Sequence, residues 1–347
     1  VIIVTPAMPG RAREGDLVAL PSLPLPTKTG YCLTVPIARG RSARATIASL
    51  DLVHAHSLFV TGWMALGVAR RRRIPLVFTY HTQLDHYAHY GPLGPRVTRM
   101  LTSALTRGYA NAAHAVIAPT PSIAEHLRSR GVRSPIHVLP SGIDVAAFAR
   151  GRRTAELRAA LGVDATQRLV VCVSRLGREK QVDLAIDAVA ELPPGVHLAI
   201  AGDGPLRADL ERRASGLGLD GRVHFLGSLP RERLADVYAC ADAFVFTSRT
   251  ETQGLVLLEA AAAGLPVVAV DSPQAREALE GEGVFVPPSA PALAQALGVA
   301  LESRAPGARE ARRERARGFG AGKTAERHLA LYESLLECRL PASDRHV

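Results

Sequence analysis

The 347-residue sequence lacks several features that would assign it to common protein classes. Its only four cysteines, Cys32, Cys172, Cys240 and Cys338, lie far apart and form no paired spacing. This pattern argues against a zinc ribbon, a redox pair or a disulfide framework, and we expect ordinary reduced thiols. No run approaches the roughly 20 apolar residues of a membrane-spanning helix, and no charged-then-apolar leader opens the sequence. These absences predict a cytoplasmic protein.

Two nucleotide-binding motifs are present only in part. A P-loop ending at Thr324 needs a glycine where Arg317 stands, and no apolar strand precedes it. A dinucleotide fingerprint beginning at Gly202 needs its third glycine where Arg207 stands. Neither nucleoside triphosphate hydrolysis nor dehydrogenase chemistry is therefore expected.

The net charge of +10 is concentrated in the first half of the chain. Residues 1–150 carry 17 Lys/Arg against 6 Asp/Glu, whereas residues 151–347 carry 25 against 26. A basic face on one domain suits an anionic membrane surface, an acidic acceptor or nucleic acid, and a general bias toward arginine is a further explanation. The basic residues accompany no recognisable nucleic-acid-reading motif, so we expect no nucleic-acid partner.

The second half shows the pattern of repeated strand-helix units. From residue 168 onward, short apolar runs alternate with amphipathic stretches, which predicts a parallel sheet. Several runs are apolar throughout, as expected when helices cover both faces of the sheet. We therefore expect a doubly wound domain, with strands over 169–174, 196–201, 223–226, 243–247, 266–270 and 283–286.

The first half shows the same pattern less completely, with strands expected over 1–5, 52–55, 76–80, 115–119 and 136–139. The fold class predicted is α/β, with two doubly wound, Rossmann-like domains facing across a cleft. Ligands of such folds bind outside the carboxyl ends of the strands, so the cleft is the expected active site. We place the domains at residues 1–150 and 151–320, followed by a C-terminal helix and tail at 321–347.

The segment TSRTETQGLVLLEAAAA at 247–263 carries the strongest chemical signal. A strand ends there, a polar loop follows, and a helix begins near Gly254. Glu251 in the loop and Glu259 about one turn inside the helix offer two carboxylates to a hydroxyl-rich ligand. The backbone N–H groups of Gly254 and Leu255 can hold phosphate oxygens at the helix start, where glycine permits close approach. The alternative is a capping loop with incidental acidic residues.

A second segment, SRLGREK at 174–180, directly follows the expected strand 169–174. Arg175 and Lys180 emerge at the carboxyl end of that strand. Two cations at this place can neutralise a departing nucleoside diphosphate. A solvated charged turn is the alternative, and it is weakened because both segments lie at the same edge of the sheet.

These segments, taken in order, resemble family 4 of the retaining glycosyltransferases, which have the GT-B fold. The resemblance is carried by SRLGREK at 174–180, AGDGP at 201–205, VHFLG at 223–227, E-x7-E at 251–259 and AAGLPVVA at 262–269. It implies an acceptor-binding first domain and a donor-binding second domain. The donor residues it implies are Arg175 and Lys180 for the diphosphate, Glu251 for sugar hydroxyls, Glu259 for the ribose, Leu226 for the base, and Gly204, Thr252, Gln253, Gly254 and Leu255 around them.

In the first half, YHTQLDHYAHY at 80–90 resembles the acceptor-side loop of the family. The resemblance implies that His81 faces the donor sugar, and that Gln83, Asp85 and Tyr87 lie on the acceptor side. Its several histidines could also suggest a metal site, but no clear carboxylate or cysteine partner accompanies them, and no metal is expected. The sequence contains no Asp-x-Asp triplet. We therefore expect metal-independent transfer with no cofactor, the nucleotide sugar being a co-substrate.

Within the family, TYHTQLDHY and TETQG most resemble enzymes that place hexoses on diacylglycerol and related lipids, including mannosyltransferases. This implies transfer from a UDP-glucose or GDP-mannose type donor to a membrane glycolipid precursor, with retention. A catalytically inactive nucleotide-sugar-binding protein of the same fold is the alternative.

Residues 95–110 read as a basic amphipathic helix, with Arg96, Arg99 and Arg107 in one arc beside apolar residues such as Met100. Such a helix can lie on an anionic membrane, which suggests a peripheral position on its inner face. The alternative is a helix docked on its own core with a solvated basic edge.

The beginning of the sequence departs from the family pattern. The family begins with a strand, a glycine-rich loop and a helix, whereas residues 1–6 resemble its second strand. We therefore expect a truncated chain without the loop that approaches the donor phosphates, which leaves the activity of the chain itself open.

Overall fold

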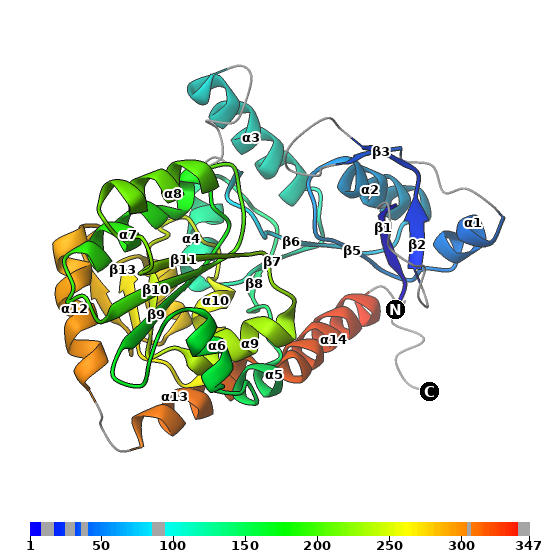
Figure 1. The fold of residues 1–347 in the computed structure, drawn as a ribbon. Coiled ribbons are helices and arrows are strands. Elements are labelled where there is room, and N and C mark those ends of the chain that lie inside the picture. The colour runs from blue at the N-terminus through cyan, green and yellow to red at the C-terminus, as the bar shows by residue number, and fades with distance from the viewer. Residues whose placement is uncertain (8–16, 25–31, 36–40, 85–93, 304–306, 339–347) are drawn as a thin grey trace. The chain divides into compact units, whose positions relative to one another are not determined.

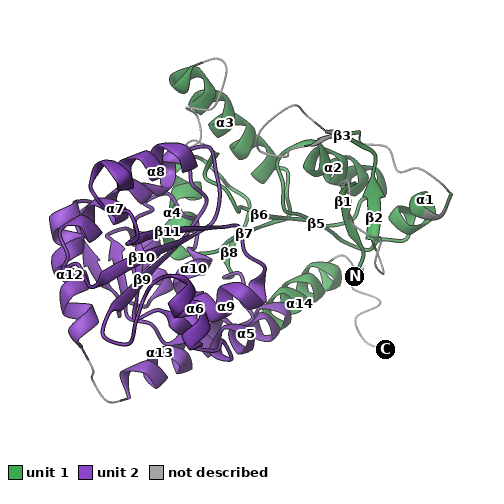
Figure 2. Ribbon diagram, viewed as in Figure 1, with its two compact units in different colours: residues 1–139, 326–347 green, residues 140–325 purple. Residues whose placement is uncertain are grey.

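The computed structural model describes residues 1–7, 17–24, 32–35, 41–84, 94–303 and 307–338. The chain is an α/β protein with parallel sheets (Figure 1). It divides into two compact units, which Figure 2 shows in different colours: unit 1 comprises residues 1–139 and 326–347, and unit 2 comprises residues 140–325. The boundary predicted from the sequence follows residue 150, eleven residues beyond the division between the units.

Unit 2 is built on a six-stranded parallel sheet whose strand order is β11-β10-β9-β12-β13-β14. The order starts at β9 and runs outward in both directions, so the winding reverses between β9 and β12. Crevices at such a reversal are where open α/β sheets bind ligands. The strands lie within one or two residues of the expected positions: β9 (Arg168–Val173), β10 (Val196–Ala201), β11 (Val223–Gly227), β12 (Ala243–Phe246), β13 (Val267–Val270) and β14 (Val284–Val286).

Both faces of this sheet are covered, which explains why its central strands are apolar throughout. In β9, Val171 and Val173 belong to one core cluster, while Val170 and Cys172 belong to the other. The helices of the unit are α5 (Val145–Ala149), α6 (Ala155–Ala160), α7 (Val182–Ala190), α8 (Arg207–Gly216), α9 (Arg231–Cys240), α10 (Leu255–Ala263), α11 (Pro273–Ala278), α12 (Ala290–Glu302) and α13 (Ala308–Ala316).

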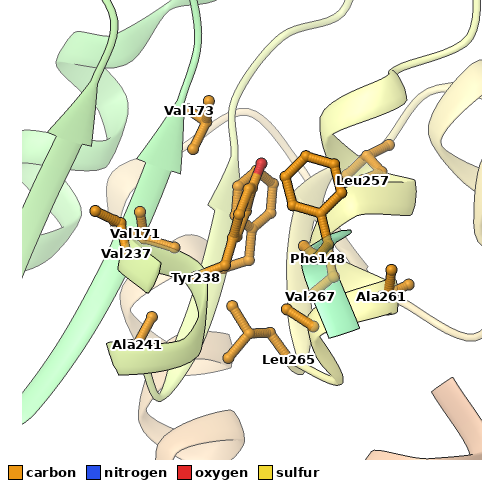
Figure 3. Packing of buried hydrophobic residues seen from close by; sticks show 14 of the residues in the cluster. Phe148, Val171, Val173, Val237, Tyr238, Ala241, Leu257, Ala261, Leu265 and Val267 are labelled. Atoms are coloured by element: carbon orange, nitrogen blue, oxygen red, sulfur yellow. The ribbon is translucent and has the colours of Figure 1, made fainter. Parts of the chain in front are cut away.

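Tyr238 lies at the centre of the first of these clusters (Figure 3). Its ring is fully buried and meets the ring of Phe148 edge to face, with the centroids 5.6 Å apart. Aromatic pairs in this geometry add roughly 1 kcal/mol beyond the burial of their area. This contact packs α9 against α5.

Unit 1 contains a four-stranded parallel sheet in chain order, formed by β5 (Val53–Ala55), β6 (Leu76–Thr79), β7 (Ala115–Ala118) and β8 (Ile136–Val138). Two small sheets accompany it. The parallel pair joins β1 (Ile3–Pro6) to β2 (Leu17–Leu20), and the antiparallel pair joins β3 (Ser22–Pro24) to β4 (Cys32–Thr34). Strands β2, β3 and β4 were not predicted from the sequence. Strands β3 and β4 have three residues each and lack an apolar run, whereas β2 is a run of four apolar residues that the prediction missed.

The helices of unit 1 are α1 (Arg41–Ala48), α2 (Val60–Arg72), α3 (Pro95–Ala110), α4 (Pro121–Ser129) and most of α14 (Ala321–Glu337). Leu331 of α14 is buried with Val77 of β6 and with Ala115 and Ile117 of β7. The C-terminal helix is therefore part of the core of unit 1. Across the described ranges, no helix is both long and apolar enough to cross a membrane.

Candidate active site

The loops that follow β9 and β12 meet at the reversal point of the sheet in unit 2. Lys180 ends the short 3-10 helix Arg178–Lys180, and its ammonium group forms a short ion pair with the carboxylate of Glu251. The hydroxyl of Thr247 donates to the backbone carbonyl of Lys180 over 2.7 Å. The side chains of Lys180 and Glu251 keep only 12% and 23% of their surface exposed. The structure thus joins a cation and a carboxylate that the sequence placed on separate motifs.

Arg175 lies half-buried in the same loop after β9. In the part of the chain that the structure describes, no carboxylate forms a salt bridge with it. Its guanidinium group is thus available to an anionic ligand.

Two glycines of the loop after β10 allow this segment to pack directly on the backbone of the Arg175 loop. A Cβ atom on Gly202 would lie 1.9 Å from the carbonyl oxygen of Ser174, and one on Gly204 would lie 2.5 Å from that of Leu176. Real Cβ atoms never come so close to a carbonyl oxygen. Gly204, proposed from the sequence as a donor residue, therefore has a packing role that any larger residue would disturb.

The start of α10 directly follows the loop after β12 and brings four of the named residues together. Gly254 adopts a left-handed conformation with φ of 74°, and Leu255 begins the helix. Gln253 is buried, and its side-chain amide both donates to the carbonyl of Ser141, over 3.0 Å, and accepts from its N–H, over 2.7 Å. Both polar atoms of the Gln253 side chain thus bond to the backbone of Ser141. Thr252, which precedes Gln253 in the chain, is half-buried.

Two hydroxyl groups in the loop after β12 were missed by the sequence analysis. The side-chain oxygens of Ser248 and Thr250 are buried and have no hydrogen-bond partner among the described residues. Unpartnered buried hydroxyls are uncommon and call for an explanation such as a water or a ligand. Their only signal in the sequence is a run of small polar residues directly after a buried strand.

Glu259 and Leu226 lie deeper in unit 2. Glu259, the fifth residue of α10, accepts a hydrogen bond from the hydroxyl of Tyr238 over 3.0 Å. Burial raises the pKa of Glu259, while the Tyr238 hydroxyl and the charge of Arg231 act in the opposite direction. Leu226 of β11 is half-buried against the core cluster that contains Tyr238. One carboxylate oxygen of Glu259 is thus held within the protein.

Unit 1 holds a cluster of histidines at the carboxyl ends of β5 and β6. The Nε2 atom of His81 is 2.8 Å from the Nδ1 atom of His56. His54 lies between two hydroxyls, with its Nε2 2.6 Å from Thr79 Oγ1 and its Nδ1 2.5 Å from Tyr332 Oη. His54 and His56 were not among the residues predicted from the sequence, although their spacing of two residues places them on one side of an extended segment.

The remaining acceptor-side candidates are only partly described. Gln83 is buried, with 5% of its surface exposed. Asp85 and Tyr87 lie outside the described residues, as do His86 and His89. No group of three or more potential metal-binding side chains is gathered among the residues that the structure describes.

Comparison with known proteins assigns both halves of the chain. The model of "Glycosyltransferase Family 4" matches residues 1–147, and that of "Glycosyl transferases group 1" matches residues 153–319. A D-inositol 3-phosphate glycosyltransferase of Kineococcus radiotolerans is 31% identical over 340 residues, which cover 86% of this chain and 74% of that protein. The chain belongs to glycosyltransferase family 4. This confirms the resemblance seen in the sequence.

Two further similarities bear on this family 4 glycosyltransferase. The alpha-monoglucosyldiacylglycerol synthase of Streptococcus pneumoniae is 34% identical over 245 residues, which cover 68% of this chain but only 56% of that protein. The chain thus spans little more than half the length of that relative. The crystal structure of Anabaena Alr3699/HepE in complex with UDP is 25% identical and has a TM-score of 0.72, covering 84% of this chain and 81% of that one. The fold is GT-B, as predicted.

Three histidines of this family 4 glycosyltransferase have lowered pKa values. Burial lowers the pKa of His54 to about 3, and the charges of His56, His328 and His81 add to the effect. Packing also lowers the pKa of His56 to about 4, with His81 and His328 contributing. The pKa of His81 is lowered in the same way, first by burial and then by His328.

These pKa values predict a loss of stability in mild acid. The pKa of His54 lies below its ordinary value of 6.5, so the unfolded chain binds the proton more readily and the folded state loses stability as pH falls from about 6.5 toward 3. For His54 alone, the free energy of unfolding should fall by about 2 kcal/mol between pH 6.5 and pH 5. Urea denaturation at both pH values measures this change. The His54→Gln variant should show a smaller change than the unmodified chain. An undiminished change in His54→Gln contradicts the assignment.

Proposed function

We propose that the chain transfers a hexose from a nucleotide diphosphate sugar to an acceptor hydroxyl. The observation that carries this proposal is the ion pair of Lys180 and Glu251 at the reversal point of the sheet in unit 2. Arg175 and Lys180 supply the positive charge that a diphosphate requires, and Glu251 offers oxygen atoms to sugar hydroxyls. The N–H groups at the start of α10 provide further donors for phosphate oxygens.

The proposed reaction uses these cations to stabilise the leaving group. The bond from the anomeric carbon to the diphosphate oxygen breaks, and negative charge accumulates on the diphosphate, where Arg175 and Lys180 offset it. The acceptor oxygen forms the new bond on the face that the diphosphate leaves, and its proton passes to the diphosphate. The configuration of the anomeric carbon is thereby retained. His81 of unit 1 is the proposed partner of the sugar.

We further propose that this reaction needs no metal ion, because the two cationic side chains occupy the role that a metal has in other transferases. The proposal predicts full turnover after dialysis against EDTA. Restoration of turnover by added magnesium or manganese, after its loss in EDTA, would contradict it.

The relatives favour a sugar nucleotide donor and a lipid acceptor. The name of the pneumococcal protein describes synthesis of a monoglucosyldiacylglycerol, and the Anabaena structure holds UDP. We therefore propose UDP-glucose as the first donor to test and diacylglycerol as the first acceptor, with GDP-mannose and UDP-galactose as the competing donors.

Calorimetry with each donor, followed by measurement of nucleotide release in the presence of diacylglycerol liposomes, tests the proposal. Micromolar binding of one donor and release that depends on the lipid would support it. Binding without release over a panel of lipid and soluble acceptors would favour a nonenzymatic sugar-nucleotide-binding protein. Failure to bind any donor would contradict the donor site itself.

A surface of unit 1 offers a place for a lipid. Helix α2 and helix α3 contain no acidic residue and together carry six arginines. An open groove of about 620 Å³ between them is lined by Leu58, Phe59, Val60, Trp63, Met64, Gly67, Arg71 and Leu105. Ordinary ligand sites have comparable volumes, and tryptophan is enriched where proteins meet the membrane interface.

The apolar side of α3 is exposed as well. Met100 keeps 64% of its surface exposed, and Val97 and Leu101 are also exposed, beside Arg96 and Arg99. This arrangement favours the membrane-facing interpretation of the sequence over a helix docked on its own core. We propose that α2 and α3 rest on an anionic membrane as a peripheral surface, with the lipid acceptor near the groove.

This proposal predicts that Arg99→Gln weakens binding to vesicles that contain anionic lipid. One arginine near such a surface is worth about 1 kcal/mol, so affinity should fall roughly fivefold at low salt. The matched control is Arg212→Gln on α8 of unit 2, whose side chain is 71% exposed. Sedimentation compares the two variants on vesicles with about 30% anionic lipid, a content chosen to give a surface potential on the order of −30 mV, and on vesicles without anionic lipid. Equal losses in both variants, or indifference to lipid charge, would contradict the proposed surface.

A further inference from the structure

Three histidines and a tyrosine of unit 1 form a continuous line of contacts that includes His81. His81 Nε2 lies 2.8 Å from His56 Nδ1. The ring of His56 lies against that of His54, with the centroids 4.1 Å apart. His54 Nδ1 is in turn 2.5 Å from the hydroxyl oxygen of Tyr332. The line joins the end of β5, the loop after β6 and the C-terminal helix α14.

The contact between His56 and His81 limits the protonation of both rings. A hydrogen bond between two ring nitrogens needs one N–H donor and one lone pair, so it exists only while at least one ring is neutral. The bond also couples the tautomers of the two rings, since a proton on Nε2 of His81 requires a bare Nδ1 on His56, and the reverse. His56 thereby constrains both the orientation and the tautomer of His81.

His54 is constrained from both sides. A neutral imidazole donates through one nitrogen and accepts through the other, and the hydroxyls of Thr79 and Tyr332 are within 2.6 Å and 2.5 Å of these two atoms. The lowered pKa values of His54 and His56 mean that both rings are neutral at pH 7, so these contacts persist there.

The C-terminal helix supplies the fixed end of the line. Leu331, the neighbour of Tyr332, is buried against Val77, Ala115 and Ile117 of the sheet. This packing holds the backbone of α14 at Tyr332 without any help from the tyrosine hydroxyl. Loss of the hydroxyl alone should therefore loosen His54 while leaving the helix in place.

We propose that His56 and Tyr332 are positioning residues for His81, with Tyr332 acting through His54. Only one part of this proposal rests on the proposed function, namely the role of His81 at the sugar. The ordering of the His81 ring by the other three side chains stands apart from any activity. The C-terminal helix thus sets the geometry of a candidate sugar-binding residue far from it in sequence.

Nitrogen NMR of the histidine rings tests the ordering directly. The unmodified chain should show a single tautomer for His81 at pH 7, and His56→Leu should show a mixture of both. His56→Asn should restore much of the single form, because its amide places a polar atom close to the position of Nδ1. Tyr332→Phe should shift the His81 signals in the same direction as His56→Leu, by a smaller amount.

The matched control is Tyr109→Phe, which removes a buried tyrosine hydroxyl that donates to the carbonyl of Gly62 over 2.8 Å. This variant loses a comparable hydrogen bond in the same unit, so it should leave the His81 signals unchanged. If His81 is unaffected in both His56→Leu and Tyr332→Phe, the positioning role is wrong. Tyr332→Phe keeps its apolar packing, so the test survives if His56→Leu fails to fold.

Kinetics then separate the two proposals. Because misplacement of a reacting group can cost up to about a hundredfold, we expect kcat to fall roughly tenfold in His56→Leu and about threefold in Tyr332→Phe. The KM for the donor should stay within about twofold, since an interaction made mainly in the transition state affects kcat. A rise in KM with unchanged kcat would overturn the positioning role. Absence of turnover in the unmodified chain, with the expected NMR changes, would instead refute the proposed function alone.

Discussion

Replacing Lys180 by alanine is expected to lower turnover by roughly two to three powers of ten, the loss that follows removal of one preorganised group from a developing negative charge. Lys180 is largely buried and is held by Glu251, so its ammonium group is already in place before the donor arrives. Arg175→Ala should cause a loss of similar size, because the two cations act on the same diphosphate. The effect should appear mainly in kcat, since the charge develops as the bond breaks.

The matched control for this prediction is Arg178→Ala. Arg178 lies in the same short 3-10 helix as Lys180 but is exposed, so its loss should change turnover by less than about twofold, as for an ordinary surface charge. Nucleotide release under saturating donor measures all three variants, and thermal unfolding confirms that each is folded. Unchanged turnover in a folded Lys180→Ala protein would refute the assignment of this residue to the diphosphate.

Substituting alanine for Gly202 should destabilise unit 2 by about 3 kcal/mol, the upper range of overpacking in a well-packed region. The new Cβ would lie 1.9 Å from the carbonyl oxygen of Ser174, which is backbone and cannot rotate away. Gly202 also has a φ of 136°, a conformation that residues with a side chain rarely adopt. The loop that carries Arg175 must then move, so donor binding should weaken as well.

Gly216→Ala provides the comparison for that experiment. Apart from its chain neighbours and the backbone of its own helix, no atom lies within 4 Å of a Cβ at Gly216, which ends α8 and does not have a positive φ. Alanine there should be neutral or should stabilise the protein by up to about 1 kcal/mol. Urea denaturation and donor calorimetry of both variants give the two effects. Equal stability of Gly202→Ala and Gly216→Ala would show that the close approach to Ser174 can relax.

Much of the fold could be predicted because burial on both faces leaves a clear pattern in the sequence. The strands of unit 2 read as apolar runs, so their limits were found to within one or two residues. The small strands β3 and β4 of unit 1 were missed because three residues paired with a single neighbour need no such run, and β2 was missed although all four of its residues are apolar. The position of α14 was found, but its membership in the core of unit 1 depends on Leu331 meeting β6 and β7.

The candidate site was likewise predicted only in part. The sequence by itself determined which residue types follow each strand, and in α/β proteins this is enough to place Arg175, Lys180, Glu251 and His81 at carboxyl ends. Only the tertiary structure decided which of them meet, because the strand order brings β9 beside β12 although 69 residues separate Val173 from Ala243 in the chain.

The same reason explains which side-chain contacts could not be predicted from the sequence. Three contacts join residues at least 71 positions apart in the chain. They are the ion pair of Lys180 with Glu251, the hydrogen bond of the Gln253 side chain with the backbone of Ser141, and the contact of Tyr332 with His54. Local patterns record burial and backbone preference, which act on neighbours along the chain. Contacts between distant side chains depend on how the elements pack, and only the folded structure contains that information.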